Sequence, residues 1–187
     1  MSLKKTLILG MAMLLSVIIL IIIESRIFTK LPIELAELSP EFYEAIQSGN
    51  LDDISLTIYY INPDILTRAP LSVIDLINRD EAHGRMNKII ANGSRLTEYI
   101  DLLEQLSIAK LKPIEKSSGI NARIYYVFET SESVKLLDVA MWGKNGSIYV
   151  NDIEMVGCNI LYDAVIPFLP EYEAEDLEMN KDIYLNN

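Results

Sequence analysis

The sequence predicts an α+β domain with a mainly antiparallel sheet and two or three packed helices, preceded by one N-terminal transmembrane helix. Three observations lead to this fold class. The chain of 187 residues opens with a long apolar run, its middle mixes strand-like and helix-like segments, and its second half contains short strands joined by tight turns. Strands that follow one another through hairpins, with helices among them, are typical of α+β domains. We expect four parts: an anchor over residues 1–30, a stalk over 31–50, a domain over 51–170 and an acidic tail over 171–187.

The N-terminal run comprises the 17 uncharged residues Leu7–Ile23, preceded by Lys4 and Lys5. As a helix rising ~1.5 Å per residue it covers about 25 Å, and Ile27 and Phe28 extend it toward the ~30 Å of a hydrocarbon core. Three fates compete for this run: an uncleaved membrane anchor, a cleaved signal peptide and a buried helix. No Ala-x-Ala-like cleavage site follows it, so we expect the anchor. The membrane is then the partner of residues 7–23.

The charges that flank the run bear on its orientation. Two basic residues lie on each side, and the α-amine with its short preceding tail favours a cytoplasmic N-terminus. Residues 31–187 would then lie outside a single-pass protein of the cell membrane. They carry 12 Lys and Arg against 26 Asp and Glu, a formal charge of −14. We therefore expect the acidic body to stand off from an anionic lipid surface.

The elements of the remaining chain follow from periodicity. Alternating apolar residues indicate half-buried strands, and apolar residues at helical spacing indicate helices. The acidic stretch 171–187 is expected to be a solvated, frayed tail. Strands are expected over 54–61, 86–91, 123–130, 134–142, 147–150 and 153–156, with a weak one at Ile114, and helices over 40–48, 73–78, 97–106 and 160–169.

Capping residues mark the ends of the first two soluble helices. Ser39 as N-cap followed by Pro40 is typical of a helix start, and Gly49 is typical of the residue just after a helix end. Ser72, with Asp75 three residues later, has the spacing of a capping box. The narrow apolar face of the first helix suits packing against a larger body.

Composition excludes several classes of function. A net charge of −11 excludes a basic nucleic-acid footprint, so no nucleic acid is expected as a partner. One Cys excludes an internal disulfide, and one His, His83 in a polar loop, excludes a zinc site built from several His and Cys ligands. The sequence therefore assigns no catalytic, cofactor-binding or metal-binding residue.

An envelope hydrolase that uses carboxylates or Cys158 is the alternative. Asp138 is of interest because it lies inside an apolar strand, and Cys158 precedes an expected helix whose N-terminus would favour a thiolate. The simpler interpretation is that Asp138 points outward from a half-solvated strand and that Cys158 is a small buried residue.

Two tyrosine doublets give a binding signal. Tyr59-Tyr60 and Tyr125-Tyr126 lie in expected strands, where neighbouring side chains point to opposite faces. Alternation with the surrounding isoleucines assigns Tyr60 and Tyr126 to the core. Tyrosine and tryptophan are favoured at recognition surfaces, although they are also good strand formers. The candidate binding face consists of Tyr59, Tyr125, Tyr149 and Trp142.

Five segments carry a resemblance to other proteins: LTIYYINPDILTRAP (56–70), NGSRLTEYIDLLEQL (92–106), ARIYYVFET (122–130), LDVAMWG (137–143) and LYDAVIPFLP (161–170). In these the chain resembles a group of small, uncharacterised membrane-anchored or exported proteins of clostridia-like Gram-positive bacteria. The resemblance implies a bacterial cell envelope and carries no activity. We expect a non-enzymatic, membrane-anchored extracytoplasmic module that binds an envelope protein, peptide or glycan, with a structural subunit of a membrane complex as a further alternative.

Overall fold

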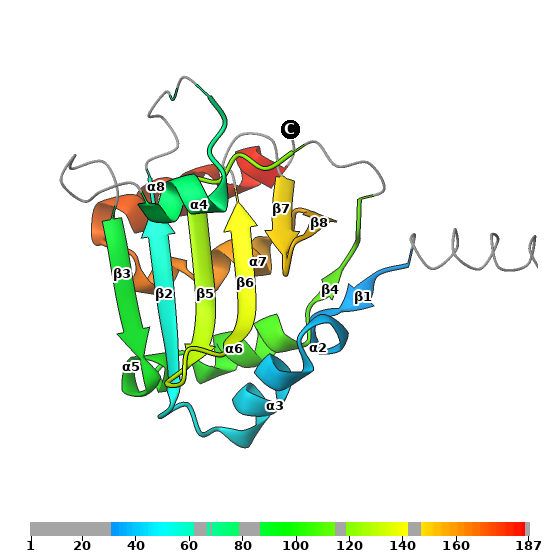
Figure 1. Cartoon of the computed structure of the whole chain (residues 1–187), viewed down its shortest axis with the longest axis vertical. Helices are drawn as coiled ribbons and strands as arrows, with labels where there is room; N and C mark the ends of the chain where they lie inside the picture. Colours follow the sequence, from blue (N-terminus) through cyan, green and yellow to red (C-terminus); the bar gives the residue numbers. More distant parts are fainter. Residues whose placement is uncertain are drawn as a thin grey trace, which may run out of the picture.

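A computed structural model of the chain describes residues 31–61, 67, 69–78, 87–114, 119–141 and 147–185 (Figure 1). The expected anchor over residues 7–23, His83 and Trp142 lie outside the described residues. Within the described ranges, no helix is both long enough and apolar enough to cross a membrane.

Within the described residues, six antiparallel strands form the main sheet in the spatial order β3-β2-β5-β6-β7-β8 (Figure 1). Each strand lies close to where residue alternation predicts it. The predicted α+β class with an antiparallel sheet is therefore confirmed. The bounds are β2 (Ile54–Tyr60), β3 (Asn87–Asn92), β5 (Ile124–Thr130), β6 (Lys135–Met141), β7 (Ser147–Val150) and β8 (Ile153–Val156).

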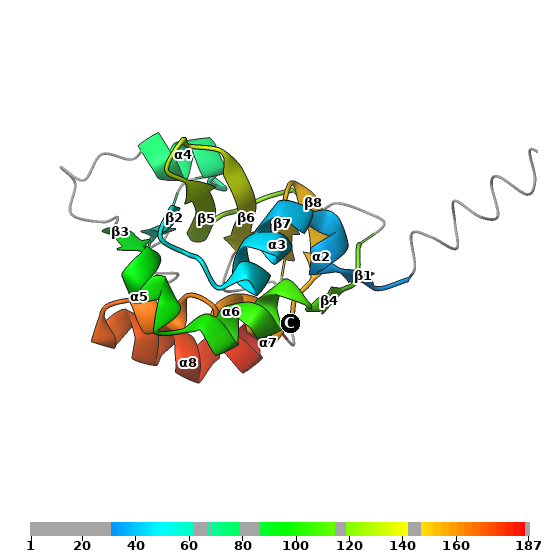
Figure 2. The same ribbon diagram turned by 90° about the horizontal axis from the view of Figure 1, so that it is seen from below.

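One face of the sheet, which we call the inner face, is covered by helices that lie behind the sheet in Figure 1 and beneath it in Figure 2. The residues that alternation assigns to the core, among them Leu56, Tyr60 and Tyr126, are buried there. The covering elements are α5 (Gly93–Thr97), α6 (Ile100–Ser107), α7 (Asn159–Asp163), the 3-10 helix η2 (Ile166–Phe168) and α8 (Glu171–Leu185).

Two of the predicted helices are divided in the structure. The helix expected over 97–106 is α5 and α6, and Gly93 begins α5 against the backbone of Leu51. A Cβ at Gly93 would lie 2.1 Å from the Leu51 carbonyl oxygen, so this close approach requires glycine. The helix expected over 160–169 ends at Asp163 and resumes as η2, whose Pro167 cannot donate a backbone hydrogen bond.

The segment expected to be a stalk is packed into the domain. Strand β1 (Ile33–Glu34) pairs with β4 (Lys110–Leu111), and the short helices α2 (Leu35–Leu38) and α3 (Pro40–Ser48) follow it. The side chains of Leu35, Phe42 and Ile46 are buried in the main core. The domain core thus begins close to residue 33, because three large apolar side chains of this segment are removed from water.

The caps of α3 are partly as predicted. Gly49 ends the helix in the left-handed conformation, with φ +67°, as expected. Ser39 makes no side-chain cap, contrary to the prediction; its hydroxyl donates instead to the backbone carbonyl of Leu136 at the start of β6. Ser39 therefore joins α3 to the sheet.

The acidic stretch after residue 170 is the helix α8 rather than a frayed tail. Leu177 is 1% exposed and Ala174 packs beside it on the core. Lys181 Nζ lies 2.8 Å from a carboxylate oxygen of Asp163 in α7 and 2.8 Å from one of Glu178. The prediction of a frayed tail is wrong, because two apolar side chains and an ion pair attach this acidic helix to the domain.

Candidate functional site

The other face of the sheet, the outer face, carries a row of paired residues that we call the tyrosine row. Its members lie opposite one another on successive strands from β3 to β8 because the strands pair in this register. They are Lys88, Tyr59, Tyr125, Ala140, Tyr149 and Glu154. Three of the four residues of the predicted binding face, Tyr59, Tyr125 and Tyr149, thus lie together, and Trp142 is outside the described residues.

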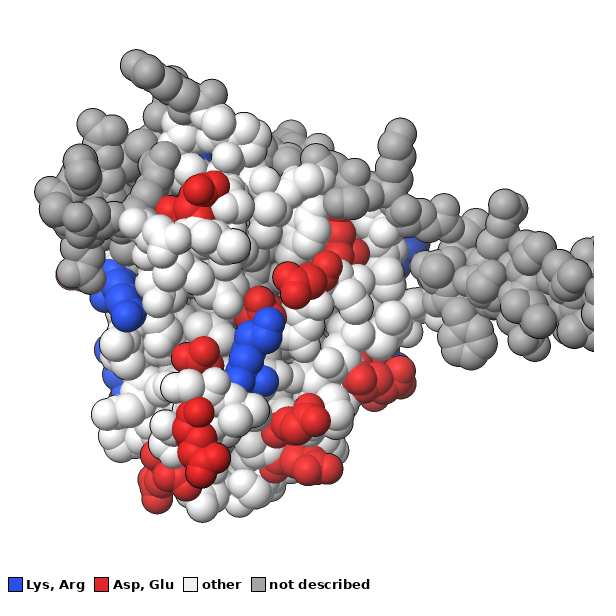
Figure 3. Space-filling model, viewed as in Figure 1, with Lys and Arg blue, Asp and Glu red and all other residues white. Residues whose placement is uncertain are grey.

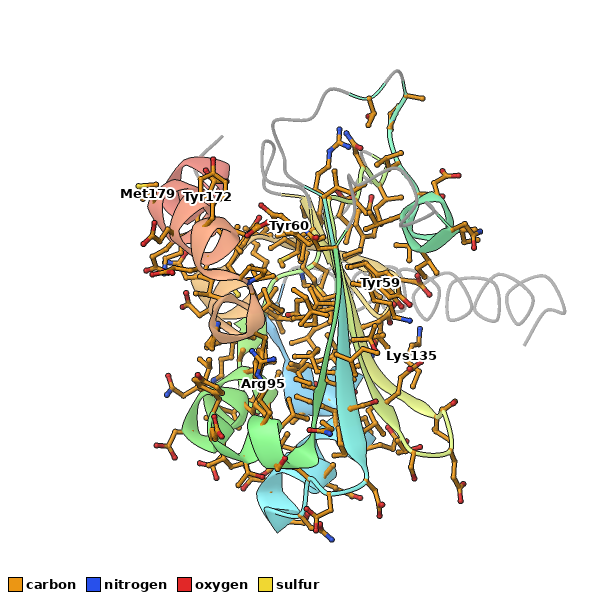
Figure 4. The ribbon with its side chains drawn as sticks, turned by 90° about the vertical axis from the view of Figure 1, so that its left-hand side faces the viewer. Tyr59, Tyr60, Arg95, Lys135, Tyr172 and Met179 are labelled. Atoms are coloured by element: carbon orange, nitrogen blue, oxygen red, sulfur yellow. The ribbon has the colours of Figure 1, made fainter. Side chains whose placement is uncertain are left out.

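The aromatic rings at the β3 side of the row are in contact. The Tyr59 and Tyr125 ring centroids are 6.0 Å apart, with 30° between the ring planes. The Lys88 ammonium lies 5.5 Å from the Tyr59 ring centroid, a cation–π distance. Figure 4 shows Tyr59 and Lys135 on one side of the sheet and Tyr60 on the side of the helices. Within each doublet the two rings take opposite faces, as alternation predicts.

Tyr125 is less accessible than a surface tyrosine. It is 7% exposed, because α4 (Val73–Asn78) and the segment 119–122 pack on this part of the outer face. The Ala122 N–H donates to the carbonyl of Leu71, two residues before α4, at 2.8 Å, which joins segment 119–122 to the chain that leads into α4. The predicted exposed ring at Tyr125 is thus a buried one, whereas Tyr59 and Tyr149 stay half-buried at the margin of this second cluster.

The start of α4 is the capping box that the sequence predicts. The Ser72 N–H donates to the Asp75 carboxylate at 3.1 Å, and the Asp75 N–H donates to the Ser72 hydroxyl at 3.0 Å. Leu76 of α4 is completely buried against the outer face. The capped helix is therefore a second, smaller layer of the fold.

Asp138 lies beside the tyrosine row and is 8% exposed. Its carboxylate is 2.9 Å from the Lys135 ammonium, and it lies close enough to the Tyr125 hydroxyl to raise the pKa of that group. Burial raises the pKa of Tyr125 well above its ordinary value of 10, and the negative charges of Asp138 and Glu129 raise this pKa further. Lys135 thus pairs with the Asp138 carboxylate, while burial and the nearby negative charges keep the Tyr125 hydroxyl in its protonated form.

Lys88 and Lys135 are functional candidates that the sequence did not indicate. Lys88 reaches Tyr59 only through the pairing of β3 with β2. Lys135 and Asp138 are three residues apart in β6, and they share the outer face because the register between β5 and β6 shifts between Phe128 and Glu129. Figure 3 views this face, on which acidic side chains gather at the lower end and basic ones form small groups at the centre and the left edge. Contacts between lysines and residues of other strands depend on register, for which no single segment carries a signal.

Cys158 is not prepared for nucleophilic chemistry. It is the half-buried N-cap residue of α7, and backbone hydrogen bonds from Leu161 and Ile160 lower the pKa of its thiol. Burial acts more strongly, so the pKa is raised overall. Because the thiolate is the nucleophilic form, this environment makes Cys158 less reactive than an exposed cysteine.

The described residues hold no group of three or more His, Cys, Asp or Glu side chains that could bind a metal ion. A shallow groove of about 400 Å³ lies on the helix layer, lined by Ile166, Ala174, Glu175, Glu178 and Met179. It contains none of the residues that the sequence predicts for the binding face. Comparisons with protein-family models, with curated proteins and with solved structures find no match for this chain.

Proposed function

We propose that this chain is a non-enzymatic binding module, held at the outer side of the cell membrane by residues 7–23, and that the outer face of its sheet binds a protein of the cell envelope. The observation that carries the proposal is the tyrosine row. It places Tyr59, Tyr149 and Lys88 at the surface of one sheet face, around the buried Tyr125.

Tyr59 and Tyr149 are suited to contact a partner. Each is half-buried at the margin of the second cluster, and Tyr59 contacts both Tyr125 and Lys88. A ring already held by its neighbours loses little conformational entropy on binding, and tyrosine offers a large apolar area with one polar group. The cost of ordering this surface is therefore low.

The size of the row favours a protein partner over a glycan. From Lys88 on β3 to Tyr149 on β7 there are four interstrand spacings, or about 19 Å at ~4.8 Å each. Small ligands bind mainly in concave sites, whereas a partly apolar face of this width is typical of protein interfaces. Lys88, on the edge strand β3, would favour an acidic group on the partner.

Two observations weigh against the hydrolase alternative. The Asp138 carboxylate is 8% exposed and paired with Lys135 at 2.9 Å, so it is poorly placed to accept a proton from substrate. The raised pKa of Cys158 opposes its use as a nucleophile. The support for the membrane location is the apolar run Leu7–Ile23 in the sequence.

The test is recovery of the intact chain, with its partner, from cells that produce it. We expect the chain in the membrane fraction after an alkaline wash, digested by protease added outside wall-stripped cells. When the chain is purified from detergent-solubilised membranes, one protein partner should co-purify with it. The double variant Tyr59→Ser, Tyr149→Ser should reduce recovery of the partner about tenfold or more, because it removes two interface tyrosines.

The matched control is Tyr172→Ser, which removes an exposed tyrosine from the opposite layer and should leave recovery unchanged. Equal loss with Tyr172→Ser would contradict the assignment of the binding face. A mature chain that begins after residue 24, or a chain protected from external protease, would contradict the location. Recovery of a polysaccharide in place of a protein would contradict the choice of partner.

A further inference from the structure

The chain enters the domain at one edge of the sheet. Strand β1 pairs with β4, and the Leu35 N–H donates to the Ala109 carbonyl at 2.8 Å. The chain directly after β4 pairs with β8, since the Ile114 N–H donates to the Glu154 carbonyl at 2.9 Å and the Val156 N–H donates to the Lys112 carbonyl at 2.8 Å. Figures 1 and 2 both show β1, β4 and β8 at the same end of the molecule. We call this the β8 end.

Exposed apolar side chains gather at the β8 end. Of the eleven large apolar side chains that are exposed among the described residues, five belong to β8 or to segments attached to β1 and β4. The other edge of the sheet, strand β3, has one such residue, Ile90, at 59% exposure. The five are Leu31, Ile108, Ile114, Ile153 and Val156.

The charge of this end differs from that of the acidic body. Lys110 is paired with Glu34, with 3.3 Å between the ammonium and the carboxylate, and Lys112 lies beside β8. Asp152 is an exposed acid here, and Glu154 is 6% exposed. The charges are thus mixed in sign, which reduces the repulsion that a body of charge −14 feels from anionic lipid.

Few residues of the chain connect the apolar run to the β8 end. Nine residues, 24–32, separate Ile23 from the first residue of β1, and at full extension they reach about 30 Å. If the spanning helix continues through Phe28, four residues remain, with a reach of about 14 Å. The polar headgroup layer is itself about 5–8 Å thick on each side of the hydrocarbon core.

We infer that the β8 end of the domain rests on the lipid headgroups, with its exposed isoleucines toward the bilayer. This inference rests on the proposed membrane anchor. Of the six strands, β8 then lies nearest the membrane and β3 lies farthest from it. Five interstrand spacings place β3 about 24 Å farther from the membrane than β8. The outer face, with the tyrosine row, opens sideways and stays accessible to a partner in the same membrane.

The experiment compares two isoleucines on opposite edges of the sheet. In the full chain with Cys158→Ala, a polarity-sensitive fluorophore is attached at Ile153→Cys on β8 or at the matched control Ile90→Cys on β3. The chain is reconstituted into phosphatidylcholine vesicles that contain lipid spin-labelled near the headgroup. Ile108→Cys, outside the sheet and 54% exposed, is a second probe of the β8 end should labelling at β8 disturb the fold.

We expect the chain to float with the vesicles. The spin label should quench the probes at Ile153 and Ile108 about twofold more than the probe at Ile90, because β3 would lie ~24 Å farther from the membrane than β8. Equal quenching at both edges, or stronger quenching at Ile90, in a chain that floats would overturn the orientation and leave the anchor intact. A chain that does not float would overturn both.

Discussion

The inner and outer faces of the same six strands are packed in different ways. Among the described residues, the inner face belongs to a cluster of 30 buried residues to which the N-terminal helices, α6, α7 and α8 all contribute. The outer face has a cluster of seven, closed by α4 and the segment 119–122. Tyr126 and Tyr125 are neighbours in β5, yet Tyr126 is completely buried in the larger cluster and Tyr125 is 7% exposed in the smaller.

Under the proposed function, this difference would separate stability from recognition. On the inner face the Tyr126 hydroxyl donates to the Leu161 carbonyl at 3.1 Å, and its ring packs edge-on against Phe128 with centroids 6.1 Å apart. On the outer face Tyr59 is half-buried and contacts a lysine and a second ring. We therefore expect inner-face substitutions to change the free energy of unfolding and outer-face substitutions to change binding.

The largest effect is expected for Tyr126→Ala. Removing a fully buried ring and its hydrogen bond should lower the free energy of unfolding by about 3–5 kcal/mol, the range for large aromatic truncations in cores. Tyr59→Ala is the matched change on the adjacent strand and the opposite face, and it should cost less than about 1 kcal/mol because the ring is only half-buried. Urea unfolding at neutral pH measures both. A Tyr59 variant as unstable as the Tyr126 variant would contradict the division between the faces.

A smaller effect is expected at alkaline pH. The pKa of Tyr125 is raised in the folded chain, so above pH 10 the unfolded chain releases a proton that the folded chain retains. The stability that Tyr125 contributes is therefore complete below pH 10 and is lost as the pH rises beyond it, by about 1 kcal/mol near pH 11. Tyr125→Phe should reduce the loss of stability between pH 9 and pH 11 by that amount.

Asp138→Asn sharpens this comparison between the faces. It removes a charge that raises the pKa of Tyr125, whereas the raised pKa of Tyr126 is caused first by burial and then by Cys158 and Tyr162 on the inner face. Spectrophotometric titration of the folded chain should show the Tyr125 hydroxyl titrating at lower pH in Asp138→Asn. The same pH profile in Asp138→Asn as in the original chain would show that the carboxylate does not act on Tyr125.

Residue alternation predicts the strands well because each strand has one face in the dry core. Its own sequence therefore shows apolar residues at every second position. The opposite faces of each tyrosine doublet follow from the same alternation. The helix α8 has no such signal, since two small contacts, Ala174 and Leu177, and the bridge from Lys181 to Asp163 attach an otherwise acidic segment. Its packing depends on where α7 lies, which the segment itself does not encode.

The candidate site was predictable only in part. Tyr59, Tyr125 and Tyr149 could be assigned to one face from alternation, but their alignment in one row depends on three strand registers. The burial of Tyr125 depends on α4 folding over the outer face, a contact between segments some fifty residues apart in the chain. The pairing of β1 with β4 involves only two residues in each strand, too few for a periodic pattern.

The central claim is that the outer face binds the partner while the inner face holds the fold, and photo-cross-linking tests it most directly. A photoreactive phenylalanine derivative replaces Tyr59 on the outer face or Tyr172, an exposed tyrosine of α8 on the helix layer, in the full chain within its own membranes. We predict a cross-linked adduct with a membrane or envelope protein from position 59 and none from position 172. An adduct from position 172 alone, or none from position 59 in a folded chain, would contradict the account.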